Sequence, residues 1–311
     1  MRKIFLFLFI LMMSCGHLKE AQNYYDLGNY KATLQACRVA IENDSTDAAA
    51  FMLMGQSFYK LGKMDSSLAA FNKCLALQPD NGKCKEMIFR VHNDIADGYF
   101  QKKEFRKARA EYEKALKLFP GEPKVLEKIG DTFFASGRQD KAEEQFQLAL
   151  AAAGDSLSLN KKIAKIEKLK QEAQNFLHSG LKNLKKKRYK TAIRDFSKAL
   201  EIKPDFLDAK YFRYIATGHK LYKKGSKSAL WDAIEQYGLA SALRPNAGAP
   251  HYFMGLAYNK KDKNEFDNAI RELDTAVQLE PNGQYAKVAG KKSAELKKRQ
   301  KLLRDFWGKG K

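Results

Sequence analysis

The feature that most constrains the fold is a 34-residue pattern, which is clearest at residues 48–81. Small and apolar residues recur there at three- and four-residue spacing in two runs, as on the buried faces of two amphipathic helices. Gly62 separates the two runs, and Pro79 ends the second because proline cannot continue a helix. The pattern predicts a helical hairpin. A single hairpin cannot bury both of its apolar faces, so stacked neighbours are also expected.

Variants of this pattern account for most of the chain. Further hairpins are predicted at residues 18–47, 89–122, 123–156, 173–206, 207–246 and 248–283. Residues 82–88 form an insertion between the second and third hairpins. In the sixth hairpin, Lys223–Lys227 is expected to lengthen the turn between the two helices.

The residue types at fixed positions of these hairpins resemble the tetratricopeptide repeat family. Within residues 48–81 the match consists of Gly55, Phe58, Gly62, Ser67, Phe71, Cys74, Leu75 and Pro79. The resemblance implies an all-α, right-handed superhelix (an α-solenoid) of about seven hairpins with a C-terminal capping helix. Gly55 and Ser67 are small where the two helices approach, and Phe71 is expected to fill the space beside them. Such arrays are scaffolds that bind other molecules and have no chemistry of their own.

The first fourteen residues differ from the rest and are predicted to be a signal peptide. Two basic residues precede Ile4–Met13, an apolar run of ten residues. A spanning helix needs roughly 20 apolar residues, so this run has the length of a cleaved signal. The stretch Leu11–Cys15 resembles a bacterial lipobox, which implies that Cys15 becomes the lipid-modified N-terminus of the mature protein. The alternative is an ordinary secretory signal followed by a chance cysteine.

The residues after Cys15 bear on the cellular location. Gly16 stands where an aspartate often marks retention in the inner membrane, and no acidic run follows. We therefore expect a lipid-anchored protein of the bacterial cell envelope, held on the outer membrane and facing the periplasm.

The repeats are expected to form two groups. The predicted divisions are 15–156 as a first sub-array, 157–172 as a basic helix extension, 173–283 as a second sub-array and 284–311 as a basic capping helix. One long helix is predicted over residues 159–186, and the polar stretch Ser156–Asn160 is the expected point of flexibility.

Positive charge is concentrated in two windows. The formal net charge is +21, and residues 161–190 and 284–311 together carry +17 of it. The basic residues singled out are Lys161, Lys162, Lys165, Lys185, Lys186, Lys187, Arg188, Lys297, Lys298 and Arg299. They indicate either a site for anionic lipid, an anionic envelope polymer or an acidic protein, or simply solvated helix faces. No nucleic-acid partner is expected, because a signal peptide is present and no recognition motif occurs.

The last window also carries the apolar residues Leu296, Leu302, Leu303, Phe306 and Trp307. These residues favour a cap that docks on the seventh hairpin. The alternative is a helix that lies on a membrane surface.

No catalytic, cofactor or metal site is predicted, and the protein is not expected to be an enzyme. The histidines occur singly, without metal-ligand spacing, and no phosphate loop or nucleophile elbow occurs. Cys37 and Cys74 lie at core positions, and Cys84 lies in the insertion. A disulfide between Cys74 and Cys84 is the alternative in an oxidising compartment. We expect the two to remain unpaired, because the three cysteines after Cys15 cannot all form disulfides.

In the resembled family the first helix of each hairpin lines the inner surface, where a protein or peptide partner in the envelope would bind. The positions carried over to this chain are Met52, Gln56, Tyr59, Asn93, Asp97, Phe100, Glu127, Asp131, Phe134, Leu177, Leu181, Leu184, Tyr252, Leu256 and Asn259. This mixture of aromatic and polar groups suits an extended or helical peptide. For each residue the alternative role is packing between repeats.

Overall fold

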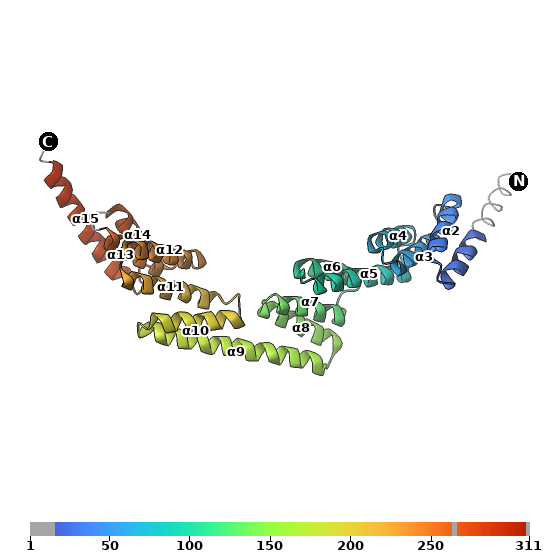
Figure 1. The fold of residues 1–311 in the computed structure, drawn as a ribbon, viewed down its shortest axis with the longest axis horizontal. Helices are drawn as coiled ribbons and strands as arrows, with labels where there is room; N and C mark the ends of the chain where they lie inside the picture. Colours follow the sequence, from blue (N-terminus) through green and yellow to red (C-terminus); the bar gives the residue numbers. More distant parts are fainter. Residues whose placement is uncertain (1–15, 263–265, 309–311) are drawn as a thin grey trace. The chain divides into compact units, whose positions relative to one another are not determined.

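The computed structural model describes residues 16–262 and 266–308, and every regular element in them is helical (Figure 1). The predicted signal peptide and Cys15 lie outside the described residues. The chain divides into two compact units, one up to Ala164 and the other from Lys165. The all-α fold class predicted from the repeats is confirmed.

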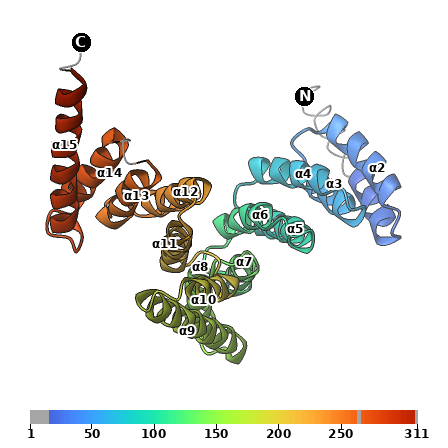
Figure 2. The same ribbon diagram turned by 60° about the vertical axis from the view of Figure 1, so that its left-hand side comes forward.

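The first unit contains a helical segment at 16–26 and seven further helices. These are α2 (Tyr30–Asn43), α3 (Ala48–Lys60), α4 (Met64–Leu77), α5 (Gly82–Gln101), α6 (Phe105–Leu118), α7 (Pro123–Ala135) and α8 (Gln139–Ala153). Helix α9 (Leu157–Lys185) begins in this unit and continues into the second. It confirms the single long helix predicted over 159–186. From α2 to α8, consecutive helices pack against each other in chain order, as Figure 2 shows.

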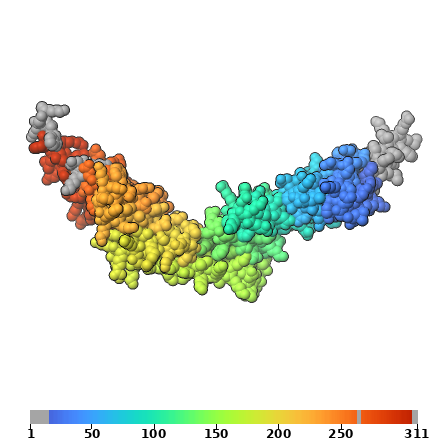
Figure 3. Space-filling view, viewed as in Figure 1, coloured from blue at the N-terminus to red at the C-terminus, as the bar shows by residue number. Residues whose placement is uncertain are grey.

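The second unit repeats the same arrangement. Its remaining helices are α10 (Tyr189–Ile202), α11 (Leu207–Lys224), α12 (Lys227–Leu243), α13 (Gly248–Lys261), α14 (Phe266–Leu279) and α15 (Ala286–Gly308). Figure 3 shows one face of the molecule with its atoms drawn as spheres, on which neighbouring helices of each unit meet. Each buried cluster is shared between neighbouring helices, as expected for hairpins that are stable only when stacked.

Close contact within four of the hairpins comes from a glycine that faces a large ring. A Cβ atom added at Gly55 would lie 2.6 Å from ring atoms of Phe71, which is fully buried. The same pairing occurs at Gly130–Phe146, Gly180–Phe196 and Gly218–Tyr237. The predicted packing of Phe71 beside Gly55 is therefore confirmed, and it recurs in both units.

The insertion at residues 82–88 is helical and forms the first turns of α5. It places Cys84 beside Cys74 at the end of α4, and the two form a disulfide with a Cα–Cα distance of 6.5 Å. The prediction that Cys74 and Cys84 remain unpaired is wrong. The pairing depends on the insertion being helical, because that brings Cys84 onto the side of α5 that faces α4. Cys37 is buried and unpaired.

The predicted long turn in the sixth hairpin is also wrong, because the extra residues lengthen the helices. Helix α11 continues to Lys224, and Gly225 ends it in a left-handed conformation with φ of 76°. Ser226 then caps α12 by accepting a hydrogen bond from the Ala229 backbone N–H. The two helices have 18 and 17 residues, compared with 13 and 14 in α3 and α4.

Helix α15 caps the second unit. Leu296 is buried and Leu303 is partly buried against a cluster that contains Phe266 and Leu273, which confirms the capping role. Leu302 and Phe306 are exposed. The side chain of Trp307 lies outside the described part of the chain.

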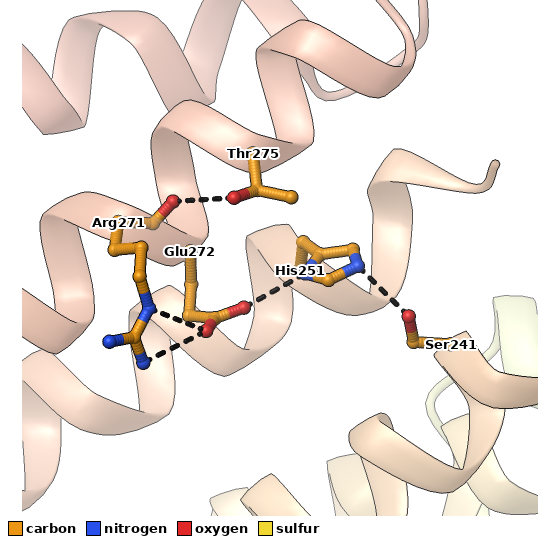
Figure 4. A network of polar contacts seen from close by, with 5 residues as sticks. All are labelled: Ser241, His251, Arg271, Glu272 and Thr275. Atoms are coloured by element: carbon orange, nitrogen blue, oxygen red, sulfur yellow. Dashed lines mark hydrogen bonds and ion pairs between the residues drawn. The ribbon is translucent and has the colours of Figure 1, made fainter. Parts of the chain in front are cut away.

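A polar contact between paired helices occurs at equivalent places in the two units. In the second unit, His251 Nδ1 donates to Glu272 Oε2 at 2.8 Å, and His251 Nε2 lies 2.9 Å from Ser241 Oγ (Figure 4). In the first unit, His92 Nδ1 contacts Glu111 Oε2 at 2.7 Å. Because all of these partners come from adjacent helices, the contacts stabilise packing.

The carboxyl groups of both pairs titrate below their ordinary range. Burial alone would raise the pKa of Glu272, but hydrogen bonds from His251 and Arg271 outweigh it and lower the pKa. For Glu111, the hydrogen bonds from Lys114 and His92 likewise outweigh burial and lower the pKa.

We predict that Gly55→Ala lowers the urea midpoint of unfolding, because the new methyl group overlaps the Phe71 ring. Overpacking of this kind costs about 1–3 kcal/mol. The control is Gly98→Ala in α5, where an added Cβ has no neighbour within 4 Å. Replacing this helical glycine should stabilise the protein by about 0.5–1 kcal/mol. Circular dichroism measures the midpoints. Equal midpoints for the two variants would contradict the packing role of Gly55.

We predict that Glu272→Gln destabilises the second unit at pH 7 and has less effect in acid. A carboxyl with a lowered folded-state pKa stabilises the fold above its unfolded value, here 4.5, and this contribution is lost as the pH falls through the lower folded pKa. Thermal unfolding at pH 7 and pH 3.5 measures the difference. Glu235→Gln, at an exposed position on α12, is the control. A pH-independent effect of Glu272→Gln would show that the ionised carboxylate is unimportant.

Candidate functional site

A groove with a volume of about 550 Å³ lies in the second unit, between α9, α11, α13 and the turn that precedes α15. We call it the aromatic groove. It is lined by Leu181, Leu184, Lys185, Lys187, Tyr189, Tyr211, Phe212, Ile215, His219, Tyr222, Tyr237, Ala249, Phe253, Leu256, Gln284 and Tyr285. Most of these side chains are aromatic or aliphatic, and none is a carboxylate.

Helical periodicity explains why these side chains converge. On α11, residues Tyr211, Ile215, His219 and Tyr222 recur every three or four positions and therefore share one face. The neighbouring first helices present apolar residues with the same spacing, Leu181 and Leu184 on α9 and Phe253 and Leu256 on α13. Three adjacent first helices therefore form one apolar surface.

The inner part of the aromatic groove holds a neutral histidine. His219 Nδ1 lies 2.8 Å from the hydroxyl of Tyr237, and the Phe253 ring meets the imidazole edge-on with the centroids 4.4 Å apart. Burial lowers the pKa of His219 to about 4, so the ring is uncharged near pH 7. Burial also raises the pKa of Tyr237. This part of the groove therefore offers apolar surface and no formal charge.

Four lysines occupy one end of the groove, and we call them the cationic rim. Lys185 and Lys187 line the groove itself. An adjoining hollow of about 360 Å³ adds Lys223 and Lys260, and shares Tyr189, His219 and Tyr222 with the groove. Lys260 Nζ donates to the Tyr222 carbonyl oxygen at 2.8 Å and lies 4.3 Å from the centre of the Tyr222 ring. The site thus combines an uncharged aromatic interior with positive charge at one end.

The structure brings some of the predicted partner-binding residues of the second unit into this groove. Leu181, Leu184 and Leu256 line it. Tyr252 stacks on the lining residue Tyr285 with the ring centroids 4.8 Å apart. The two other predicted residues lie elsewhere: Leu177 is buried in the core and Asn259 is half-buried. Their role in binding stays a prediction.

In the first unit, many of the predicted binding residues contact one another. Asp97 accepts hydrogen bonds from Tyr112 and, at 2.7 Å, from Lys128. Lys162 bridges Glu127 at 2.8 Å and Asp131 at 2.7 Å. These ion pairs connect successive hairpins, which is the packing role considered for each position.

The other predicted residues of the first unit are distributed over its hairpins. Tyr59 donates a hydrogen bond to Asp94, and together with Asn93 these residues line a smaller hollow of about 300 Å³. Phe100 meets Phe105 edge-on, with the ring centroids 5.6 Å apart. The remaining predicted positions, all partly buried, are Met52, Gln56 and Phe134.

The predicted basic residues fall into two groups. Lys162 is held by carboxylates, and Lys297 pairs with Asp274 at 2.8 Å. The other members have exposed side chains, namely Lys161, Lys165, Lys185, Lys186, Lys187, Arg188, Lys298 and Arg299. Among them, Lys185 and Lys187 lie at the aromatic groove.

The sixth hairpin supplies groove residues that the sequence analysis missed. No lining position was predicted there, although the positions carried over for the other repeats fall on Tyr211 and Ile215 in this one. The residues concerned are Tyr211, Phe212, Ile215, His219, Tyr222 and Tyr237. The signal that could have found most of them is the recurrence of ring-bearing side chains along one face of residues 207–224.

Among the residues that the structure describes, no cluster of three or more histidine, cysteine, aspartate or glutamate side chains is arranged to hold a metal ion. The same part of the chain contains no helix that is both long and apolar enough to span a bilayer.

Comparison with known proteins identifies the repeat. Family models of the tetratricopeptide repeat match residues 48–81, 93–156 and 173–206. A TPR repeat-containing protein of Methanocaldococcus jannaschii is 24% identical over 317 residues, covering 83% of this chain and 55% of that protein. Tetratricopeptide repeat protein 16 of Homo sapiens is 25% identical over 199 residues, covering 62% of this chain and 22% of that protein. The chain thus spans about half, or less, of the length of these curated relatives.

Solved structures of this repeat are also similar. The TPR domain of P58(IPK) has a TM-score of 0.43 at 14% identity, with 92% of this chain and 98% of that chain covered. A tetratricopeptide repeat protein from Parabacteroides merdae has a TM-score of 0.37 at 14% identity, with 90% and 98% covered.

The family models match hairpins in both units, and the stacked pairs of helices and the recurring glycine–aromatic contacts have the form that such repeats require. The chain therefore contains tetratricopeptide repeats in both of its units.

Proposed function

We propose that the protein is a non-enzymatic scaffold, anchored in the bacterial cell envelope, that docks a protein partner in the aromatic groove. Tetratricopeptide repeats form protein–protein interaction scaffolds, and the groove is the feature of this chain that carries the proposal. Its tyrosine and phenylalanine rings are of the kinds enriched at the energetic centres of protein interfaces.

The groove is suited to a ligand because its rings are held in place before binding. Tyr237 stacks on Phe253 with centroids 5.4 Å apart, and Phe253 meets Tyr285 edge-on at 5.0 Å. Side chains fixed in this way lose little conformational freedom when a partner binds, so more of the contact energy contributes to affinity.

Two observations support a location in the cell envelope. The lipobox-like stretch ending at Cys15 supports a lipid anchor. The disulfide between Cys74 and Cys84 supports an oxidising compartment, because disulfides persist there and are rare in the cytosol. On this proposal the protein would be held at the outer membrane by acyl chains on Cys15 and would face the periplasm.

A second candidate function is binding of anionic lipid or an anionic envelope polymer through residues 161–190 and 284–311. The exposed side chains of Lys161, Lys186, Arg188 and Lys298 favour it. Lys162 and Lys297 are already paired with carboxylates, which weakens the contribution of these two residues. Binding of this kind would weaken steeply with added salt.

We predict that a photo-crosslinker placed at Tyr222, inside the groove, captures a protein partner in intact cells. The same group placed at Tyr214, a partly buried tyrosine of α11 outside the groove, should capture none. A further Phe253→Ala substitution should abolish the adduct formed from Tyr222. An adduct that is equally strong from both tyrosines, or that survives Phe253→Ala, would place the docking site elsewhere.

We predict that Cys15→Ala moves the mature protein from the membrane fraction into the soluble fraction. Each buried methylene of an acyl chain contributes on the order of 0.8 kcal/mol, so loss of the chains removes the main attachment. Membrane partition after cell lysis measures this. The control is Cys37→Ala, which removes a buried thiol and leaves the anchor intact. Unchanged partition of the Cys15→Ala protein would contradict lipid anchoring.

A further inference from the structure

We infer that the aromatic groove selects an acidic peptide segment that carries one large apolar side chain, with the apolar side chain inside the groove and carboxylates at the cationic rim. This inference rests on the proposed function, since it names the ligand class of the same docking site. It is based on the distribution of charge among the lining residues.

The interior of the groove suits an apolar group. Tyr211 and Tyr237 are almost fully buried, and Phe253 lies against the uncharged ring of His219. A charged group placed there would lose its hydration without gaining an opposite charge, which is strongly unfavourable. An aromatic or large aliphatic side chain would instead meet ring faces and edges at contact distances.

Carboxylates are absent from the lining of the groove and of the adjoining hollow. Glu280 lies close enough to the lining residue Tyr211 to act on it electrostatically but does not itself line the groove. Two other acidic side chains of this unit are engaged in other contacts. Asp195 accepts hydrogen bonds from Ser179 and Asn183 at 2.8 Å, and Asp208 pairs with Arg244. A basic peptide would therefore find no acidic partner in the lining.

The cationic rim favours an acidic ligand. Lys185 and Lys223 form no ion pair among the described residues, so their ammonium groups are available to a ligand. Lys187 lines both the groove and the hollow. Complementary charge of this kind guides association and discriminates against partners of the wrong sign.

A single-stranded nucleic acid could also bind a site in which lysines lie beside aromatic rings. The burial of the rings in this groove favours a peptide. Bases stack on exposed ring faces. In this groove the rings cover one another: Tyr252 stacks on Tyr285, and Phe253 covers Tyr237. The space between them fits a side chain better than a series of bases.

The test is selection of random twelve-residue peptides displayed on phage against the mature full-length protein. We expect the selected peptides to be enriched in aspartate or glutamate around one Trp, Phe, Tyr or Leu residue. A fluorescent synthetic copy of the most enriched peptide then serves as the probe in anisotropy measurements.

The rim is tested with Lys185→Glu/Lys223→Glu. The matched control is Lys186→Glu/Lys224→Glu, which makes the same change in net charge one residue away, at exposed positions that do not line the groove. Lys187 is left unchanged because its backbone is left-handed, with φ of 56°. We expect the rim variant to weaken binding of the probe at least about tenfold, and the control variant to weaken it less than about twofold. Circular dichroism verifies that both variants are folded.

The outcomes separate the two proposals. If the selected peptides bind equally well after Tyr222→Ala, the groove is not the docking site and the proposed function fails with the inference. If binding requires Tyr222 but the peptides are neutral or basic, or the rim and control variants behave alike, only the ligand class is wrong. Displacement of the probe by oligothymidylate would assign the site to nucleic acid and would also overturn the inference.

Discussion

The close approach of the two helices in each hairpin is the contact on which the rest of the structure depends. It is possible only where a residue without a large side chain faces a bulky one, as Gly55 faces Phe71 and Gly180 faces Phe196. With the large ring buried inside the hairpin, the remaining apolar rows of both helices are available to the next hairpin. Stacking then follows from the hydrophobic effect, and each repeat depends on its neighbours for burial.

Insertions in this chain lengthen helices and leave that contact intact. Helix α11 is longer than the first helix of the second hairpin, yet Gly218 still faces Tyr237 as Gly55 faces Phe71. The added turns carry features that are particular to this protein. The extension of α5 contains Cys84, which forms the disulfide, and the end of α11 carries Tyr222 and Lys223 at the groove.

Helix positions could be predicted from the sequence because each hairpin has strong apolar periodicity and clear turn residues. The errors occurred where local composition and tertiary context disagree. Residues 223–227 have the composition of a long turn, but one left-handed glycine and one serine cap suffice to join two helices there. The pairing of Cys84 with Cys74 depends on the helical phase of residues 82–88, and their weak pattern does not determine it.

Several of the predicted binding positions have a packing role in the structure, because the same position of a repeat can face either a ligand or the next hairpin. Asp97, Glu127 and Asp131 were predicted as partner contacts, and the structure shows them held by lysines of the chain itself. Which role a position has depends on side chains from the next hairpin, which a repeat pattern read one hairpin at a time does not include. Repeats five to seven differ because their first helices present mostly apolar residues along this face, such as Leu181, Ile215 and Leu256, which line a groove.

The same distinction applies to the net charge of +21. A count of basic residues gives Lys162 and Lys185 equal weight, although Lys162 neutralises two carboxylates between hairpins while Lys185 lies at the edge of an apolar groove. An exposed lysine on a helix gains little from any single ligand charge, because water screens the interaction. Beside a surface that excludes water, the same ammonium group meets a carboxylate in a less polar environment and the attraction is stronger. The lysines next to the aromatic groove are therefore the ones best placed to recognise a ligand.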